Sequence, residues 1–119
     1  MKVKKVLVSR IVSCFDGDTF RVDVDTWPKL FGYHIPVRVA RIDCPERRSS
    51  NPITKKTAEK ARDFTRTKLL NAKRILLLNV QRGKYFRLIA DVEIDGHNLA
   101  SELIQQGLAL PVSKYQKRK

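Results

Sequence analysis

Two short segments of the chain carry acidic residues where the backbone turns, and acids in such places can hold a cation. In Asp16-Gly17-Asp18-Thr19 the Asp-Gly pair is a common tight-turn dipeptide, which alone indicates little about function. Asp18, however, follows the turn directly and puts a carboxylate at the mouth of a sheet. Because hard divalent cations prefer oxygen ligands, this segment is a candidate half of a metal site.

The second segment runs from Arg38 to Glu46 and adds an arginine and two more acids. A strand is expected to deliver Arg38, and Asp43 and Glu46 stand on either side of a corner that Pro45 fixes. Taken alone, this segment can also be a solvent-facing turn with ordinary ion pairs. The two segments together are more specific, because each supplies part of a site that neither completes.

These residue types suit the hydrolysis of a phosphodiester. The substrate is anionic and resists an anionic nucleophile, so a site must neutralise charge before water can attack. A bound cation contributes charge, and the guanidinium fork of an arginine donates paired hydrogen bonds to phosphoryl oxygens. Arg38 and Arg87 are the candidate arginines, and lysine would not replace them because it is a point charge without a fork.

The charge of the chain favours a polyanionic partner. There are 25 Lys and Arg against 12 Asp and Glu, a net charge of +13, and each phosphate that a basic residue neutralises releases a counterion. Ten of the basic residues fall between residues 47 and 74, whereas half of the acids precede residue 47. A protein that only grips nucleic acid gains nothing from clustered carboxylates. Basic residues that merely solubilise the surface are the alternative, and no long basic amphipathic helix supports a membrane surface as the partner.

Alternating and β-branched segments predict the strands of a sheet. The predicted strands are residues 6–15, 20–25, 35–42, 75–80 and 86–94. Phe20, Val22 and Val24 alternate with polar residues, so we expect them in the core. In the last strand the same alternation places Phe86 inward and Arg87 on the opposite face.

A helix is predicted between the third and fourth strands from the spacing of its apolar residues. Its apolar stripe consists of Ala58, Ala61, Thr65, Leu69 and Ala72. Basic residues occupy much of the remaining surface and either face nucleic acid or are simply solvated. A second, short helix is expected after Asn98, a capping residue, with Leu99, Leu103 and Ile104 turned inward and Gly107 at its end.

Aromatic residues in the connection 26–34 allow two readings. Trp27 and Phe31 can form a platform on which bases stack. More often such a pair folds back on its own hairpin, and we favour this second arrangement.

The order of elements predicts an α+β fold, a closed, antiparallel, five-stranded OB-type β-barrel with two or three packed helices. The length fits a single domain over residues 1–119, in which 111–119 is expected to be a basic, mobile tail. Arg10 interrupts the first apolar run before it reaches the length of a signal peptide, and no stretch approaches the ~20 residues that a membrane span needs. We expect a cytoplasmic protein if Met1 is the native start, and a secreted one if this is a processed form.

Cys14 and Cys44 do not have zinc-type spacing and form no CxxC pair. Neither a thiolate metal site nor a dithiol redox role is therefore expected. A disulfide between them stays open as a possibility. Free thiols are favoured, because disulfides are dense in smaller secreted domains with poor cores.

Across nearly its whole length the chain resembles the thermonuclease, or staphylococcal-nuclease-like, family. The segments that carry the resemblance, in the right order, are Asp16-Gly17-Asp18-Thr19, Arg38 with Asp43-Cys44-Pro45-Glu46, the helix around Ala61 to Thr65, Lys84-Tyr85-Phe86-Arg87, and Asp95-Gly96 to Gly107-Leu108-Ala109. No single segment is specific, but their combination is. The resemblance implies an OB-type barrel and the Ca²⁺-dependent hydrolysis of DNA and RNA with little sequence preference, leaving 3'-phosphate ends. Mg²⁺ is the less favoured cofactor.

The resemblance also implies a role for each site residue. Asp18 and Asp43 would bind the metal through their carboxylates, and Cys44 would bind it through its backbone carbonyl. Glu46 would hold or deprotonate the attacking water; the choice stays open, because a nearby cation and two arginines weaken a carboxylate as a base. Arg38 and Arg87 would clamp the scissile phosphate, with Lys84 and Tyr85 binding the substrate beside it.

One departure from the family and two rival functions bear on this interpretation. The residue before the second arginine is usually glycine in the family but is Phe86 here, which puts the aim of Arg87 in question.

The main alternative function is a catalytically inactive OB-type module that binds nucleic acid, and the third is a protein-interaction module with incidental charge. The presence of all three acids and both arginines favours the enzyme. We expect DNA and RNA as partners, no membrane, no obligatory protein partner, and a monomer.

Overall fold

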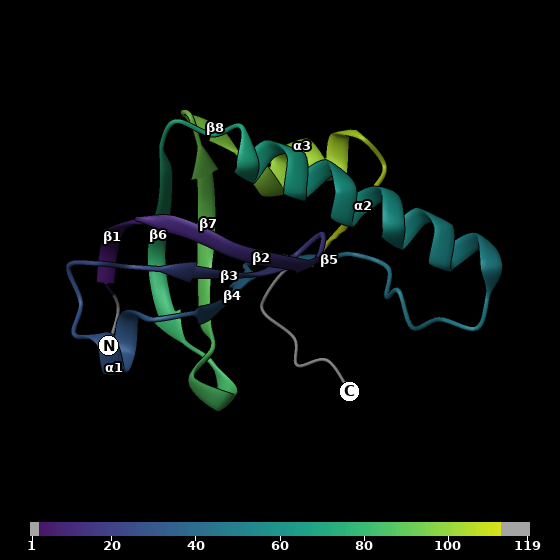
Figure 1. Ribbon diagram of the computed structural model, residues 1–119. Helices are drawn as coiled ribbons and strands as arrows, with labels where there is room; N and C mark the ends of the chain where they lie inside the picture. Colours follow the sequence, from purple (N-terminus) through teal and green to yellow (C-terminus); the bar gives the residue numbers. More distant parts are fainter. Residues whose placement is uncertain (1–2, 113–119) are drawn as a thin grey trace.

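The computed structural model describes residues 3–112, apart from the side chains of Val3, Lys4 and Tyr85, as a curled sheet with helices across it. The strands are β1 (Val3–Leu7), β2 (Arg10–Asp16), β3 (Thr19–Asp23), β4 (Ile35–Val39), β5 (Ile42–Asp43), β6 (Ile75–Arg82), β7 (Leu88–Ile94), β8 (His97–Asn98) and β9 (Leu110–Pro111). The helices are α1 (Lys29–Gly32), α2 (Pro52–Leu70), the 3-10 turn η1 (Lys84–Phe86) and α3 (Leu99–Gln105). Figure 1 shows α2 and α3 lying across the same end of the sheet.

The sheet curls into a half-barrel, and one bent stretch of chain joins its first and last strands. Its strands follow the order β1-β6-β7-β4-β3-β2, with β8 beside β7. The first and last members, β1 and β2, are separated only by Val8 and Ser9. At the bend, the Val8 N–H donates to the Ile75 carbonyl at 3.0 Å, and the Ser9 N–H donates to the Asp23 carbonyl at 2.8 Å. The strand predicted over 6–15 is therefore two strands, and the fold is the predicted α+β, OB-type one.

One pairing departs from the predicted antiparallel barrel. β4 runs parallel to β7, with Val37 opposite Leu88 and Arg38 opposite Ile89. A parallel pair needs a long crossover between its strands. Here the connection that contains α2 and β6 supplies that crossover, and α2 packs next to β2.

The alternation predicted for the core is confirmed in the middle of the sheet. Phe20, Val22 and Val24 are at most 1% exposed. Two inward placements were wrong. Ile104 is 37% exposed on α3, and Phe86 is 67% exposed in η1, before β7 begins.

Helix α2 begins and packs as its sequence indicates. The Asn51 side chain accepts hydrogen bonds from the N–H groups of residues 53 and 54, and Pro52 occupies the first turn, where its missing N–H costs nothing. The buried positions of the predicted stripe are Ala58, Ala61, Thr65 and Leu69, while Ala72 lies beyond the end of the helix. None of the helices within residues 3–112 is long and apolar enough to cross a membrane.

Two contacts fix the turn between β2 and β3 onto α2. The buried Thr65 hydroxyl donates to the Gly17 carbonyl at 2.7 Å. A Cβ added at Gly17 would stand 2.8 Å from the Ala61 Cβ and 2.9 Å from the Cys44 Sγ. Only glycine lets the helix, the turn and the corner near residue 44 approach this closely, so these contacts set where Asp18 lies.

The remaining segments differ from expectation in detail. The connection 26–34 contains α1, which Figure 1 places at the end of the sheet far from β5. Trp27 packs against the core, whereas Phe31 is 55% exposed. Pro111 belongs to β9 and pairs with Ile42; the rest of the predicted tail, residues 113–119, lies outside the described residues. Both cysteines are free, as predicted, and both are buried.

Thr65→Val should show how much the link between helix and turn contributes. Valine keeps the shape but removes the hydroxyl, so the Gly17 carbonyl loses a buried donor. We expect the free energy of unfolding, measured by urea denaturation, to fall by about 1–3 kcal/mol. Thr57→Val is the matched control, because its hydroxyl bonds only within the helix to the Ile53 carbonyl, and it should change stability by less than about 0.5 kcal/mol. Equal effects from the two variants would contradict the link.

Candidate active site

A buried guanidinium lies at the centre of the predicted site residues. Arg38, on β4, is 2% exposed, and Asp18, just before β3, is fully buried. The Arg38 Nη1 stands 3.2 Å from the Asp18 Oδ2, and its Nη2 donates to the Asp43 Oδ1 at 2.6 Å. The structure thus brings two of the predicted acids onto the two prongs of one arginine. A charge this deeply buried is tolerated only when it is paired and hydrogen-bonded.

Backbone contacts tie the same residues together. The Val39 N–H donates to the Asp18 carbonyl at 2.9 Å, and the Arg38 Nη1 donates to the Val39 carbonyl at 2.8 Å. The Cys44 N–H donates to the Asp18 Oδ2 at 2.9 Å, and the Thr19 hydroxyl bonds to the other carboxylate oxygen at 3.1 Å. Asp18 therefore links the turn after β2, strand β4 and the corner near residue 44 through its carboxylate and its backbone carbonyl.

The acids differ in their access to solvent. Asp18 is closed off, whereas the Asp43 side chain is 41% exposed and Glu46 is exposed. Within residues 3–112, no three His, Cys, Asp or Glu side chains stand close enough to hold an ion by themselves. An ion bound here would need further ligands from the backbone, from water or from a substrate.

Two hollows open on either side of Glu46. The first, of about 630 Å³, is lined by Phe15, Asp16, Thr19, Glu46, Arg47, Arg48, Lys55, Glu59 and Arg87. The second, of about 700 Å³, is lined by Asp43, Cys44, Pro45, Glu46, Ser49, Thr54 and residues 107–110. Glu46 lines both, so it stands between the exposed face of Asp43 and the hollow that contains Arg87.

The backbone of η1 places Arg87. Its N–H donates to the Lys84 carbonyl at 3.0 Å, and its carbonyl accepts from the Gly83 N–H at 2.6 Å. Phe86 has a φ of +62°, a left-handed conformation that favours glycine, so the glycine usual at this position in related proteins has a conformational reason. Phe86 adopts that conformation too, and Arg87 still reaches the hollow beside Glu46.

The two predicted substrate-binding residues stand on the same turn. Lys84 is exposed in η1, three residues before Arg87. The side chain of Tyr85 lies outside the described side chains, so its predicted role stays a prediction.

Burial keeps both thiols protonated. It raises the pKa of Cys14 to about 11 and the pKa of Cys44 to about 12. A protonated thiol is a poor nucleophile and a poor metal ligand. The chemistry of the site therefore rests on oxygen and guanidinium groups.

The sequence did not single out one feature of the first hollow. Phe15 is 50% exposed at its rim, and the Arg47 guanidinium carbon lies 4.8 Å from the centre of its ring. Phe15 was predicted only as the last residue of a strand. Its place directly before Asp16-Gly17 was the available signal, since a residue at that position shares the mouth of the sheet with Asp18.

Comparison of the sequence with known proteins identifies a matching family. The family model described as staphylococcal nuclease homologue matches residues 36–119, a range that contains Arg38, Asp43, Glu46 and Arg87 but begins after Asp18. The thermonuclease of Staphylococcus hyicus is 30% identical to the chain over 115 residues. That alignment covers 92% of this chain and 64% of the relative, so the chain spans a little less than two thirds of the relative's length.

Arg38→Met should be strongly destabilising, because it leaves Asp18 as a buried charge without its guanidinium. We expect a loss of about 3–5 kcal/mol in the free energy of unfolding, measured by urea denaturation. Lys68→Met is the control: Lys68 also pairs with an acid, Glu102, but the two side chains are 42% and 26% exposed. A pair at such a site is worth less than about 1 kcal/mol. A similarly small loss for Arg38→Met would mean that the buried pair does not hold the site together.

Proposed function

The chain belongs to the staphylococcal nuclease family, and from this premise we propose that it is a Ca²⁺-dependent nuclease. It would hydrolyse phosphodiester bonds of DNA and RNA with little sequence preference and leave 3'-phosphate ends. The observation that carries the proposal is Arg38, buried between Asp18 and Asp43, with Asp43 lining one of the two hollows beside Glu46 and Arg87 lining the other. The net charge of +13 supports a polyanionic substrate.

The donor set fits a hard divalent cation. Asp18 and Asp43 offer carboxylate oxygens on the same guanidinium, and Asp43 is open to solvent. Cys44 follows directly, and its backbone carbonyl would complete the protein's share, while its protonated thiol would not compete. Ca²⁺ accepts six to eight oxygen ligands in flexible geometry, so waters and a phosphate oxygen can fill the remaining positions. When bound, such an ion withdraws charge from the phosphoryl group.

The two arginines act on the phosphate. Arg38 contacts both carboxylates that would hold the cation, so a phosphate beside that cation would lie next to its guanidinium. Arg87 approaches from the hollow on the other side of Glu46. Planar forks from two sides can donate paired hydrogen bonds to the phosphoryl oxygens, and these bonds strengthen as charge builds up in the transition state.

Glu46 handles the attacking water. It is exposed and lines both hollows, so it can reach water next to the phosphate without displacing Asp18 from its buried position. As a carboxylate it can accept the proton of that water or hold the water in line for attack.

Cleavage of plasmid DNA and of RNA tests the proposal directly. We expect cleavage with Ca²⁺, none with chelator, and products whose 3' ends are sensitive to phosphatase. Asp18→Asn should lower the rate by at least about 100-fold, and so should Arg87→Lys, which keeps the charge but loses the fork. Arg82→Lys is the matched control, because the Arg82 guanidinium lies over the Phe86 ring at 5.1 Å and does not line either hollow. A wild-type protein that binds DNA but never cuts it with any metal would instead be an inactive binding module.

Metal binding has a readout that does not depend on activity. Ca²⁺ at about 100 times its dissociation constant should stabilise the fold by about 2.7 kcal/mol, seen as a rise in the thermal midpoint. Asp43→Asn should remove that rise. Asp63→Asn, at an acid on α2 whose side chain is 60% exposed, should keep it. A Ca²⁺ response that is the same in both variants would place the ion elsewhere.

Glu46→Gln separates the two roles of the carboxylate. Glutamine keeps the ability to bind water but cannot take its proton. If Glu46 is the base, the rate should fall by about 100-fold or more and the acid limb of the pH–rate profile should disappear. Activity close to that of the wild type from acid to alkaline pH would exclude the base role and leave orientation of the water.

A further inference from the structure

One rim of the first hollow is formed by residues that the reaction itself does not use. They are Phe15, Arg47, Arg48 and Lys55, here called the Phe15 surface. We infer that the Phe15 surface binds the nucleic-acid strand beyond the cleaved linkage, with a base stacked on Phe15 and phosphates beside Arg48 and Lys55. The inference rests on the proposed function, since it extends the path of the same substrate.

Phe15 is built as a stacking platform. It is the last residue but one of β2 and is 50% exposed, although an apolar ring of that size is usually buried. The Arg47 guanidinium carbon lies 4.8 Å from the ring centre, so a planar cation already covers part of the ring. An unpaired base has a face that can stack on such a platform whatever its identity, which agrees with little sequence preference.

Arg47 is held in place by a buried acid. Its Nε donates to the Asp16 Oδ1 at 3.1 Å, and Asp16 is only 7% exposed. The pair neutralises Arg47, so this residue positions the ring more than it attracts phosphate. A platform fixed before binding loses less conformational entropy when the strand arrives.

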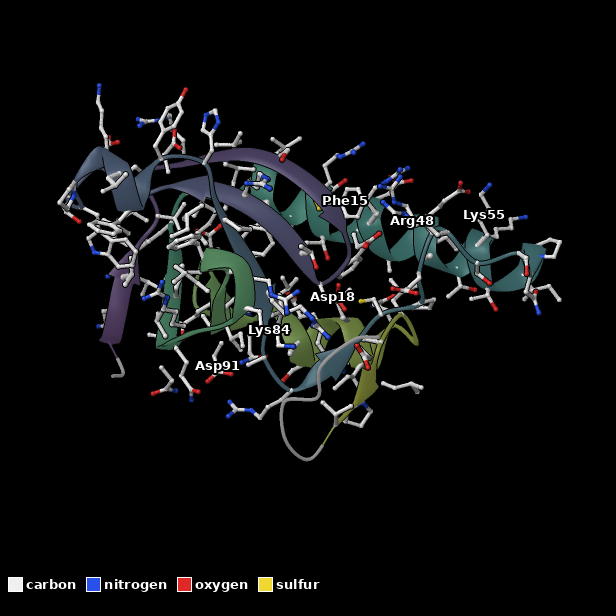
Figure 2. The ribbon with its side chains drawn as sticks, turned by 90° about the horizontal axis from the view of Figure 1, so that it is seen from below. Phe15, Asp18, Arg48, Lys55, Lys84 and Asp91 are labelled. Atoms are coloured by element: carbon white, nitrogen blue, oxygen red, sulfur yellow. The ribbon has the colours of Figure 1, made fainter. Side chains whose placement is uncertain are left out.

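Arg48 and Lys55 supply the positive charge of the Phe15 surface. Both are exposed, and Figure 2 shows Phe15, Arg48 and Lys55 following one another toward the start of α2. Glu46 and Glu59 also line the hollow and oppose them. With Asp16 paired to Arg47, the three remaining bases of the hollow, Arg48, Lys55 and Arg87, outnumber these two acids. The balance favours an anion along this rim.

A single strand fits these features better than a duplex or an acidic protein. Stacking on Phe15 needs a base whose face is free, and paired bases within a duplex do not offer one. Acidic side chains would be attracted by the charge but have no flat ring to place on Phe15. A strand with a phosphate beside Glu46 and Arg87 would also continue in the same hollow without leaving it.

Binding of fluorescent eight-nucleotide strands, measured by anisotropy with chelator present so that nothing is cut, tests the inference. One strand carries thymine at every position, and a second has the same backbone with abasic sites. We expect Phe15→Ala to weaken binding of the thymine strand by about fivefold or more and to leave the abasic strand unchanged. Phe31→Ala is the matched control, because Phe31 is 55% exposed at the far end of the sheet, and it should change neither. Phe15→Leu, which keeps apolar volume but lacks the ring, should behave like Phe15→Ala.

Lys55→Ala tests the phosphate part of the surface. It should weaken both strands equally and reduce the slope of log affinity against log salt by about 0.7. Lys56→Ala removes the same charge from the neighbouring exposed position, which does not line the hollow, and should leave that slope unchanged.

The outcomes separate this inference from the proposed function. If the wild type cuts nucleic acid but Phe15→Ala and Phe15→Leu bind both strands like Phe31→Ala, the inference is overturned and the nuclease stands. If the wild type never cuts but shows the base-dependent loss at Phe15, the inference stands and the protein is a binding module. Equal losses on the thymine and abasic strands would also overturn stacking at Phe15.

Discussion

The burial of Arg38 is the constraint on which the rest of the site depends. A guanidinium that is 2% exposed must be matched by acceptors, and the chain supplies them from two directions. Asp18 comes from the turn after β2, and Asp43 is the last residue of β5, where the corner near residue 44 begins. Because Arg38 needs both acids to balance its charge, the turn and the corner cannot separate without leaving part of that buried charge uncompensated. The charged groups proposed to act on a phosphate therefore also determine the local fold.

Close packing and backbone strain accompany this arrangement. Gly17 has no room for a side chain against Ala61 and Cys44, and Phe86 holds a left-handed backbone that costs a residue with a Cβ about 1 kcal/mol or more. Both residues are direct neighbours of a proposed functional group, Asp18 in one case and Arg87 in the other. Strain and tight packing at these points are consistent with a site that aims its groups at the expense of stability.

Local patterns predicted the elements, but not how they join. Period-two alternation placed Phe20, Val22 and Val24 in the core, and three- and four-residue spacing placed the buried face of α2, because both signals depend only on near neighbours. The bend between β1 and β2 and the parallel pairing of β4 with β7 depend on partners far along the chain. Phe86 was assigned inward because alternation cannot register a change of φ, and Phe15 was predicted only as a strand residue because alternation does not mark an exposed ring. The motif residues were recognised by type and order, whereas the direct contacts of Asp18 and Asp43 with a buried Arg38 required the structure.

The turn Asp16-Gly17-Asp18 connects the local fold to the proposed site. Its two acids each hold one arginine: Asp18 pairs with the buried Arg38, and Asp16 pairs with Arg47 at the rim. Between them Gly17 is fixed against α2 by the Thr65 hydroxyl. One three-residue turn thus orients both the proposed catalytic guanidinium and the ring of Phe15 beside it. A shift of α2 against the sheet would move both together, so the same contact would set the proposed path of a strand and the proposed point of its cleavage.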